Sequence, residues 1–335
     1  MIGANGAGKS NLIGVFRLLN EIVNRQLQLY VGRSGGVERF LHRGRKVTES
    51  LELNLEFGHS AYHCSLISTA DDSLVFRFER ASHREPSWFT PLDESLGSGH
   101  KETKLNQDSS PGLPVKAVLS ALEGWRIYHF HDTSESSKIK QVGDLADNTH
   151  LRSDAGNLAA FLYRLQETED ACFQNIIDTI RMVAPFFGDF VLQPDRLNPR
   201  KIRLEWHEQG SDAYFDAHSL SDGTLRFISL ATLLLQPELP TTVLLDEPEL
   251  GLHPYAITLL AELLRSASQR AQILVSTQSV TLVNQLSPED VIVVDRVEGE
   301  SRFRRLEESE IASWLENYSL GELWEKNLLG GRPAL

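Results

Sequence analysis

The stretch GANGAGKS, residues 3–10, fits the pattern G-x-x-x-x-G-K-[ST] at every fixed position. Glycine reaches backbone angles that are closed to other residues, so successive N–H groups of this loop can turn inward around phosphate oxygens. Lys9 is then expected to reach the β- and γ-phosphates of a nucleotide, and Ser10 to place its hydroxyl on Mg²⁺. The stretch predicts a phosphate-binding loop, and the alternative is a glycine-rich turn that matches the pattern by chance.

The residues on either side of this loop differ in what they supply. Residues 11–20 carry apolar side chains at 12, 15, 16 and 19, the spacing of a helix whose N-terminal end faces the anion. Only Met1 and Ile2 precede the loop, whereas the strand that enters such a loop normally has about five or more residues. We therefore expect a truncated or misassigned start, with one or two strands lost upstream.

The length and composition of the chain narrow the class of protein. With 335 residues, it can form one large domain or two modest ones. A formal charge of −13 argues against a surface that binds nucleic acid everywhere, although a local basic groove stays open. Two cysteines without paired spacing indicate a reducing compartment, and no apolar run approaches the roughly 20 residues of a membrane span. These features predict a soluble cytoplasmic protein.

The second half of the chain supplies an acidic pair at the end of a predicted strand. Residues 243–249 read VLLDEPE, in which Val243–Leu245 has the apolar character of a buried parallel strand. Asp246 follows at the carboxyl end, where open α/β sheets place their ligands. Asp246 can hold Mg²⁺ through water, and Glu247 can polarise the water that attacks a γ-phosphate. An ordinary turn after a strand is the alternative.

Alternating strands and helices continue beyond this acidic pair. A helix is predicted from Pro254 to near Arg270, followed by a buried strand at 272–275 and the polar cluster STQS at 276–279. Residues 291–295 read as one more strand. Strand, helix, strand, helix, strand is the alternation of a parallel sheet, so we predict an α/β fold.

A second anion site is predicted at residues 219–226, which read SLSDGTLR and precede the apolar run FISLATLLL. Ser221 and Gly223 at the N-terminus of a helix can bind an anion separately from the first loop. The alternative is an ordinary helix-capping turn. The interval from Ser221 to Asp246 leaves room for one helix and the start of a strand.

Taken in order, GANGAGKS, LSDGT, LLDEPELGLHP and STQS resemble the ATPase head of the ABC superfamily. More narrowly, they resemble the RecF/SMC/OLD-like branch, often described as AAA-family predicted ATPases. Asn5, the run Asp222–Thr224 and the segment 248–254 carry this narrowing. The segments 128–134, 151–165 and 320–333 also look like stretches of stand-alone ATPases of this branch.

The resemblance implies a P-loop NTPase and a composite site for ATP and Mg²⁺ in a head-to-tail homodimer. Asp246 and Ser10 would hold the metal, Glu247 would be the catalytic carboxylate, and Gln278 stands where the family commonly has histidine. Gln278 can orient a water but cannot take a proton, so slow turnover is expected. In one subunit the triphosphate and metal would contact Gly3, Asn5, Gly6, Gly8, Lys9 and Ser10, and in the opposing subunit the γ-phosphate would contact Ser221 and Gly223.

The region between the motifs lacks the sustained heptads of coiled-coil arms, so the chain is not expected to be an SMC with arms. Residues 50–57 and 74–80 alternate apolar and polar side chains and predict antiparallel strands. We expect one ABC-type ATPase domain over 1–335. Its parts would be the loop and first helix at 1–30, a β-rich insert at 47–135 with a polar loop near 91–114, a helical and signature region at 150–230, a core at 240–297, and a C-terminal segment at 298–335.

Several polar groups allow more than one interpretation. Gln107 and Gln141 are weak candidates for the glutamine of the lid loop. His129 and His131 would share one face if YHFHD is a strand. With Asp132 they could bind a metal, although a lid-loop role, packing or surface hydrogen bonding is favoured. Two basic clusters could face nucleic acid or be solvated loops; they comprise Arg39, Arg43, Arg45 and Lys46, and Arg196, Arg200, Lys201 and Arg203.

Three functions follow from these patterns. The first is an ATPase that dimerises around ATP and acts in DNA maintenance or phage defence, on DNA or through a partner. The second is an ATP-dependent switch for a partner effector such as a nuclease, with little hydrolysis. The third, the motor subunit of a transporter, is disfavoured by the DGT sequence at 222–224, by the GLHP segment and by the long insert.

Overall fold

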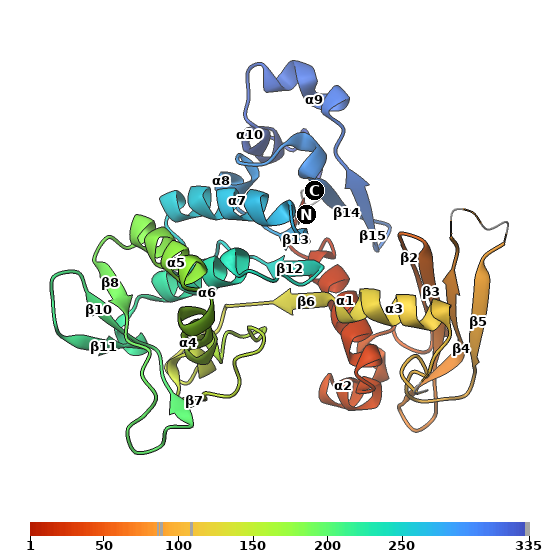
Figure 1. Cartoon of the computed structure of the whole chain (residues 1–335). Helices are drawn as coiled ribbons and strands as arrows, with labels where there is room; N and C mark the ends of the chain where they lie inside the picture. The colour runs from red at the N-terminus through yellow and green to blue at the C-terminus, as the bar shows by residue number, and fades with distance from the viewer. Residues whose placement is uncertain (86, 88–89, 108–109, 332–335) are drawn as a thin grey trace. The chain divides into compact units, whose positions relative to one another are not determined.

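The computed structural model describes residues 1–85, 87, 90–107 and 110–331. Within them, the chain folds into two compact units. The first unit comprises Met1–Ile13 and Arg126–Leu335, and the second comprises Gly14–Trp125. Helix α1 (Lys9–Val23) and strand β6 (Trp125–Tyr128) contain the two boundaries between the units (Figure 1).

The core of the first unit is a sheet whose inner strands are parallel. Strand β12 (Thr242–Asp246) pairs in parallel with β13 (Gln272–Ser276), and β6 lies on the other side of β12. Strand β1 (Ile2–Gly3) pairs in parallel with β14 (Ile292–Val297), which pairs antiparallel with β15 (Glu300–Arg305). Both residues of β1 and the apolar residues 243–245 of β12 are buried, as parallel pairing between helices requires, whereas all six residues of β15 are exposed.

Met1 joins the two halves of this sheet. Its amino group donates to Val275 O (2.6 Å), and its carbonyl accepts from the N–H of Thr277 (3.0 Å). Residues 1–3 therefore lie between β13 and β14, and Ile2 is completely buried. The strands run in the order β6, β12, β13, β1, β14 and β15. The strand that enters the loop of residues 3–10 is short, but it is hydrogen-bonded on both sides.

Helices and smaller sheets complete the first unit. Helix α6 packs against α5 and α7, and the apolar face of α5 contributes to the same core. Strands β8, β10 and β11 form an antiparallel sheet in which the rings of Phe187 and Trp206 stack with centroids 5.6 Å apart. The helices are α4 (Leu158–Thr168), α5 (Asp170–Val183), α6 (Asp222–Leu235), α7 (Pro254–Ser268), α8 (Val280–Val283), α9 (Glu308–Leu315) and α10 (Leu320–Glu325), and the further strands are β7 (Gly143–Asp144), β8 (Phe187–Phe190), β9 (Lys201–Ile202), β10 (Glu205–Glu208) and β11 (Tyr214–Asp216).

The second unit is built on an antiparallel sheet in the order β2, β3, β4, β5. These strands are β2 (Ser50–Phe57), β3 (Ser60–Ser68), β4 (Leu74–His83) and β5 (Leu92–Gly97), and the unit also contains α2 (Leu27–Arg33) and α3 (Leu113–Glu123). Its core includes a buried carboxylate, Glu79. Glu79 Oε1 accepts from Tyr62 Oη (2.7 Å) and Thr103 Oγ1, and Glu79 Oε2 accepts from the N–H of Lys104 (3.1 Å) and lies 2.9 Å from His100 Nε2.

The predicted α/β fold is confirmed, with parallel strands, an antiparallel β-rich part and a helical part. The prediction of a polar loop at 91–114 is wrong for β5 and for the start of α3; residues 108–109 of that stretch lie outside the described residues. The condition under which His129 and His131 would share one face of a strand is not met, because β6 ends at Tyr128. Among the described residues, every helix is too short or too polar to cross a bilayer.

Candidate functional site

The glycine-rich loop lies between β1 and α1 in the first unit. Gly6 and Gly8 have φ angles of 78° and 114°, which side chains with a Cβ rarely adopt. A Cβ at Gly8 would collide with the hydroxyl of Ser301 on β15. Asn5, Gly6 and Ser10 are exposed, whereas Gly3 and Gly8 are buried. The loop is therefore held against the sheet on one side and open to a ligand on the other.

Lys9 is buried within this loop, with 5% of its surface exposed. Its ammonium donates to Gly3 O (2.5 Å) and Ala4 O (3.0 Å). Burial lowers the pKa of Lys9, and the charges of Glu247 and Asp246 oppose that shift. Lys9 and the acidic pair at residues 246–247 belong to the same unit, although more than 200 residues separate them in the sequence.

The acidic pair occupies the carboxyl end of β12. Asp246 is the last residue of the strand, and Glu247 donates its N–H to Ser276 O (2.8 Å) at the end of β13. Glu247 has a φ of 41°, in the left-handed region that costs a residue with a side chain about 1–3 kcal/mol. Both acids are half-buried. Backbone strain at this point aims the Glu247 side chain out of the line of the strand.

Gln278 lies beside Glu247 in the loop that follows β13. Its side-chain Nε2 donates to Glu247 Oε1, so the amide and the carboxylate form one hydrogen-bonded pair. Parallel neighbouring strands end at the same edge of a sheet, which is why residues distant in sequence meet here. The pair can hold a water molecule that one member polarises and the other orients.

Ser221 and Gly223 lie at the N-terminus of α6. Ser221 caps the helix by accepting from the N–H of Thr224 (3.1 Å) and is exposed. A Cβ at Gly223 would come within 2.6 Å of Gly251 O, so the glycine allows the segment after β12 to pack closely on this helix. Among the described residues, no hydrogen bond or ion pair joins Ser221 or Gly223 to the loop of residues 3–10.

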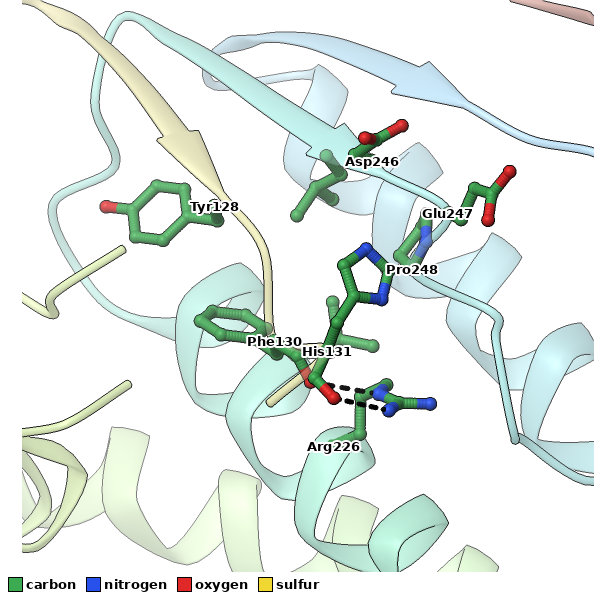
Figure 2. A pocket seen from close by; sticks show the side chains of 9 residues that line it. Tyr128, Phe130, His131, Arg226, Asp246, Glu247 and Pro248 are labelled. Atoms are coloured by element: carbon green, nitrogen blue, oxygen red, sulfur yellow. Dashed lines mark hydrogen bonds between the residues drawn. The ribbon is translucent and has the colours of Figure 1, made fainter. Parts of the chain in front are cut away.

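A small cavity adjoins the acidic pair (Figure 2). It is lined by Tyr128, Phe130, His131, Arg226, Leu230, Leu245, Asp246, Glu247 and Pro248. The Arg226 guanidinium donates to Phe130 O (2.9 Å) and His131 O (3.2 Å), which fixes the backbone after β6. Figure 2 shows the His131 ring pointing toward Glu247 and Pro248, and its Nδ1 is buried with no hydrogen-bond partner in the described part of the chain. Sequence reasoning gave Arg226 no role, although a charge within an apolar helix is a usable signal.

Other candidates lie elsewhere. Gln107 belongs to the second unit, and Gln141 donates to Glu135 O (3.2 Å). Within the part of the chain that the structure describes, no three His, Cys, Asp or Glu side chains are placed to bind a metal, and this includes the residues around His129 and Asp132. The basic clusters are partly neutralised, because Arg45 pairs with Glu38 (2.7 Å) and Asp72, Lys201 with Asp144 (3.6 Å) and Arg203 with Glu205 (2.7 Å).

The glycine-rich loop entering α1, the acidic pair at the end of β12 and the serine-capped helix α6 are the parts of the first unit that carry the motifs resembling an ABC-type ATPase head. The sequence matches, over residues 1–284, the family described as "AAA domain, putative AbiEii toxin, Type IV TA system", and the chain belongs to this family. No curated protein matches this sequence.

Solved structures show the same fold. An Smc head bound to the C-winged helix domain of ScpA has a TM-score of 0.52 at 15% identity, and the match covers 93% of this chain and 90% of that one. An Smc head with an extended coiled coil, bound to the C-terminal domain of ScpA from Pyrococcus furiosus, has a TM-score of 0.50 at 15% identity. That match covers 94% of this chain and 91% of the other. At this identity the likeness concerns the fold alone.

Proposed function

We propose that the protein binds ATP with Mg²⁺ and hydrolyses it in a head-to-tail homodimer. The observation that carries this proposal is that the loop of Lys9 and the acidic pair Asp246–Glu247 lie in one unit, where Met1 is hydrogen-bonded to the end of β13, the strand paired with β12. A cation inside a glycine-rich loop, facing two carboxylates at the end of a parallel strand, is an arrangement suited to a triphosphate and its metal.

Each residue then has a defined task. Backbone N–H groups of Gly3, Asn5, Gly6 and Gly8 surround the phosphates, and the Lys9 ammonium exchanges its loop carbonyls for phosphate oxygens. The hydroxyl of Ser10 and the carboxylate of Asp246 are oxygen donors of the kind that Mg²⁺ prefers. When bound there, Mg²⁺ neutralises charge on the β- and γ-phosphates.

Glu247 and Gln278 act on the attacking water. Gln278 orients the water through its amide, and Glu247 polarises it and accepts its proton. The oxygen of the water bonds to the γ-phosphorus, the bond from that phosphorus to the β–γ bridging oxygen breaks, and ADP and inorganic phosphate leave. Because glutamine takes no proton, Glu247 is the sole base of this pair.

In the proposed dimer, the opposing subunit supplies the Ser221–Gly223 turn to each nucleotide site. Ser221 is exposed at the N-terminus of α6, where helix N–H groups favour an anion, and among the described residues it forms no hydrogen bond with the loop of its own chain. We propose that Ser221 and Gly223 contact the γ-phosphate held by the opposing subunit. Closure of two such sites would couple ATP binding to dimerisation.

A second proposal is an ATP-dependent switch that controls a partner effector and hydrolyses little. The description of the family names a putative toxin of a type IV TA system, and both structural neighbours are bound to a partner protein. Action on DNA, in DNA maintenance or phage defence, is supported by the members of the basic clusters that form no ion pair among the described residues, which are Arg39, Arg43, Lys46, Arg196 and Arg200. The free thiols of Cys64 and Cys172 favour a cytoplasmic location.

Three variants test the proposed function. We expect Lys9→Ala to abolish binding of a fluorescent ATP analogue, and retained affinity would remove the basis of the assignment. Glu247→Gln should bind ATP, release phosphate far more slowly than wild type and accumulate as a dimer in light scattering. A third variant, Glu262→Ala on the exposed face of α7, is the control and should behave as wild type.

Duplex DNA separates the two proposals. Stimulation of wild-type turnover by DNA favours an enzyme that acts on DNA. Wild-type turnover no faster than that of Glu247→Gln, together with ATP-dependent dimerisation, favours the switch.

A further inference from the structure

Glu249 is a buried acid in the segment that follows β12, and it contacts the loop that follows β13. Only 7% of its surface is exposed. Its Oε1 accepts two hydrogen bonds, from Thr277 Oγ1 and from the N–H of Gln278 (3.3 Å). One oxygen of Glu249 therefore holds two consecutive residues of the neighbouring loop.

Thr277 is held by hydrogen bonds of both its backbone and its side chain. It is 1% exposed, its N–H donates to Met1 O (3.0 Å), and its Oγ1 accepts from the N–H of Ser279 (3.0 Å) while donating to Glu249. The hydroxyl is thus fully used, and its bond to Glu249 sets the position of the loop relative to the end of β12.

Gln278 connects this hydrogen-bond network to Glu247, the proposed catalytic carboxylate. Its N–H is held by Glu249, and its side chain donates to Glu247. The backbone of Glu247 in turn donates to Ser276 O (2.8 Å). The segments 246–249 and 276–279 are consequently tied together by the buried Glu249 carboxylate and by the backbone hydrogen bond from Glu247 to Ser276.

Stability alone does not account for Glu249. Its second oxygen is buried and has no hydrogen-bond partner among the described residues, and burial raises the pKa of the carboxyl group. A buried acceptor left unpaired costs folding free energy, and an apolar side chain of similar shape avoids that cost. A residue that lowers stability while ordering a site has the character of a positioning group.

We propose that Glu249 is a positioning residue for ATP hydrolysis, which holds Gln278 in place so that the Gln278 amide orients the attacking water beside Glu247. This inference rests on the proposed ATPase function. Glu249 itself touches neither nucleotide nor water, so its loss should slow the chemical step and leave ATP binding unchanged.

The test is the steady-state kinetics of Glu249→Ala beside Glu249→Gln, with Glu262→Ala as a matched surface control. We expect Glu249→Ala to lower kcat on the order of 10- to 100-fold, as misplacement of a catalytic group does, and to leave KM for ATP within about twofold. Glu249→Gln keeps the accepting oxygen and should retain most of the wild-type kcat. The melting temperature of each variant shows whether it is folded.

A double variant distinguishes positioning from a general structural effect. If Glu249 acts through Gln278, adding Gln278→Ala to Glu249→Ala should cause little further loss, because the two substitutions remove one interaction. Should Glu249→Ala fail to fold, Thr277→Val removes the donor while keeping the branched shape and should lower kcat similarly.

Several results would overturn the inference while leaving the ATPase intact. These are a wild-type kcat in Glu249→Ala, a loss confined to KM, equal losses in the Gln and Ala variants, or losses that multiply in the double variant. A wild-type protein that neither binds nor hydrolyses ATP would instead refute the proposed function on which the inference depends.

Discussion

Replacing Arg226 with methionine should loosen the contact between α6 and the segment after β6. Arg226 is 7% exposed, and its guanidinium donates to Phe130 O and His131 O over 2.9 and 3.2 Å. Methionine keeps most of the apolar stem but supplies no donor, so two largely buried carbonyls lose a charge-assisted partner. Each such loss costs roughly 1–2 kcal/mol, which gives about 2–4 kcal/mol for the pair.

Hydrogen–deuterium exchange measured on peptides suits this prediction, because it reports local stability in each unit separately. A loss of about 2–4 kcal/mol corresponds to exchange roughly 30- to 1000-fold faster in peptides from the N-terminal half of α6 and from residues 126–133. Arg226→Lys retains one donor and should lie between the two. The exposed Arg200→Met is the control and should exchange as wild type. Protection within about twofold of wild type in Arg226→Met would refute this reasoning.

Three further predictions concern buried groups. Removal of the Glu79 carboxylate by Glu79→Ala should lower the stability of the second unit by at least about 3 kcal/mol, since several buried donors lose their acceptor; an unchanged thermal transition would contradict this. Cys64, whose pKa burial raises to about 12, should resist alkylation at pH 8 until the second unit unfolds, and rapid labelling of the native protein would count against the described core. The raised pKa of Glu249 means that the folded state binds its proton more tightly than the unfolded chain. The contribution of the Glu249 carboxyl group to the free energy of unfolding is therefore greatest at low pH and declines as the pH rises above the ordinary pKa of 4.5. In urea unfolding, the stability of Glu249→Gln should rise relative to that of wild type over that range. A stability difference that stays constant with pH would contradict this prediction.

Some of this structure could be predicted because local pattern and final position agree. Strand β2 has the bounds that its alternation predicts, and β12 and β13 end where their apolar runs give way to polar residues. The edge strand β5 could not be predicted, since Leu92–Gly97 has little buried surface and so no periodic signal. Residues 129–132 alternate like a strand, yet Arg226 rather than a neighbouring strand binds the carbonyls of Phe130 and His131.

The residues of the candidate site also differ in whether the sequence alone could predict them. Lys9, Asp246 and Glu247 could be named from sequence because their chemistry is tied to a loop or a strand end. The role of Glu249 could not, because it depends on contacts with Thr277 and Gln278 in another loop, which only the pairing of β12 with β13 brings within reach. The left-handed backbone of Glu247 likewise has no signature in a glutamate followed by proline.

The most direct test of the composite site is to mix two variants that are inactive for different reasons. Lys9→Ala disables the nucleotide-binding loop and leaves Ser221 intact. Ser221→Arg blocks the turn at Ser221 and leaves Lys9 intact. If each ATP lies between the loop of one subunit and the turn of the other, neither variant hydrolyses ATP alone, and the mixture regains phosphate release through heterodimers that contain one intact site. Wild-type turnover by Ser221→Arg alone, or a mixture that stays inactive although heterodimers form, would contradict the account.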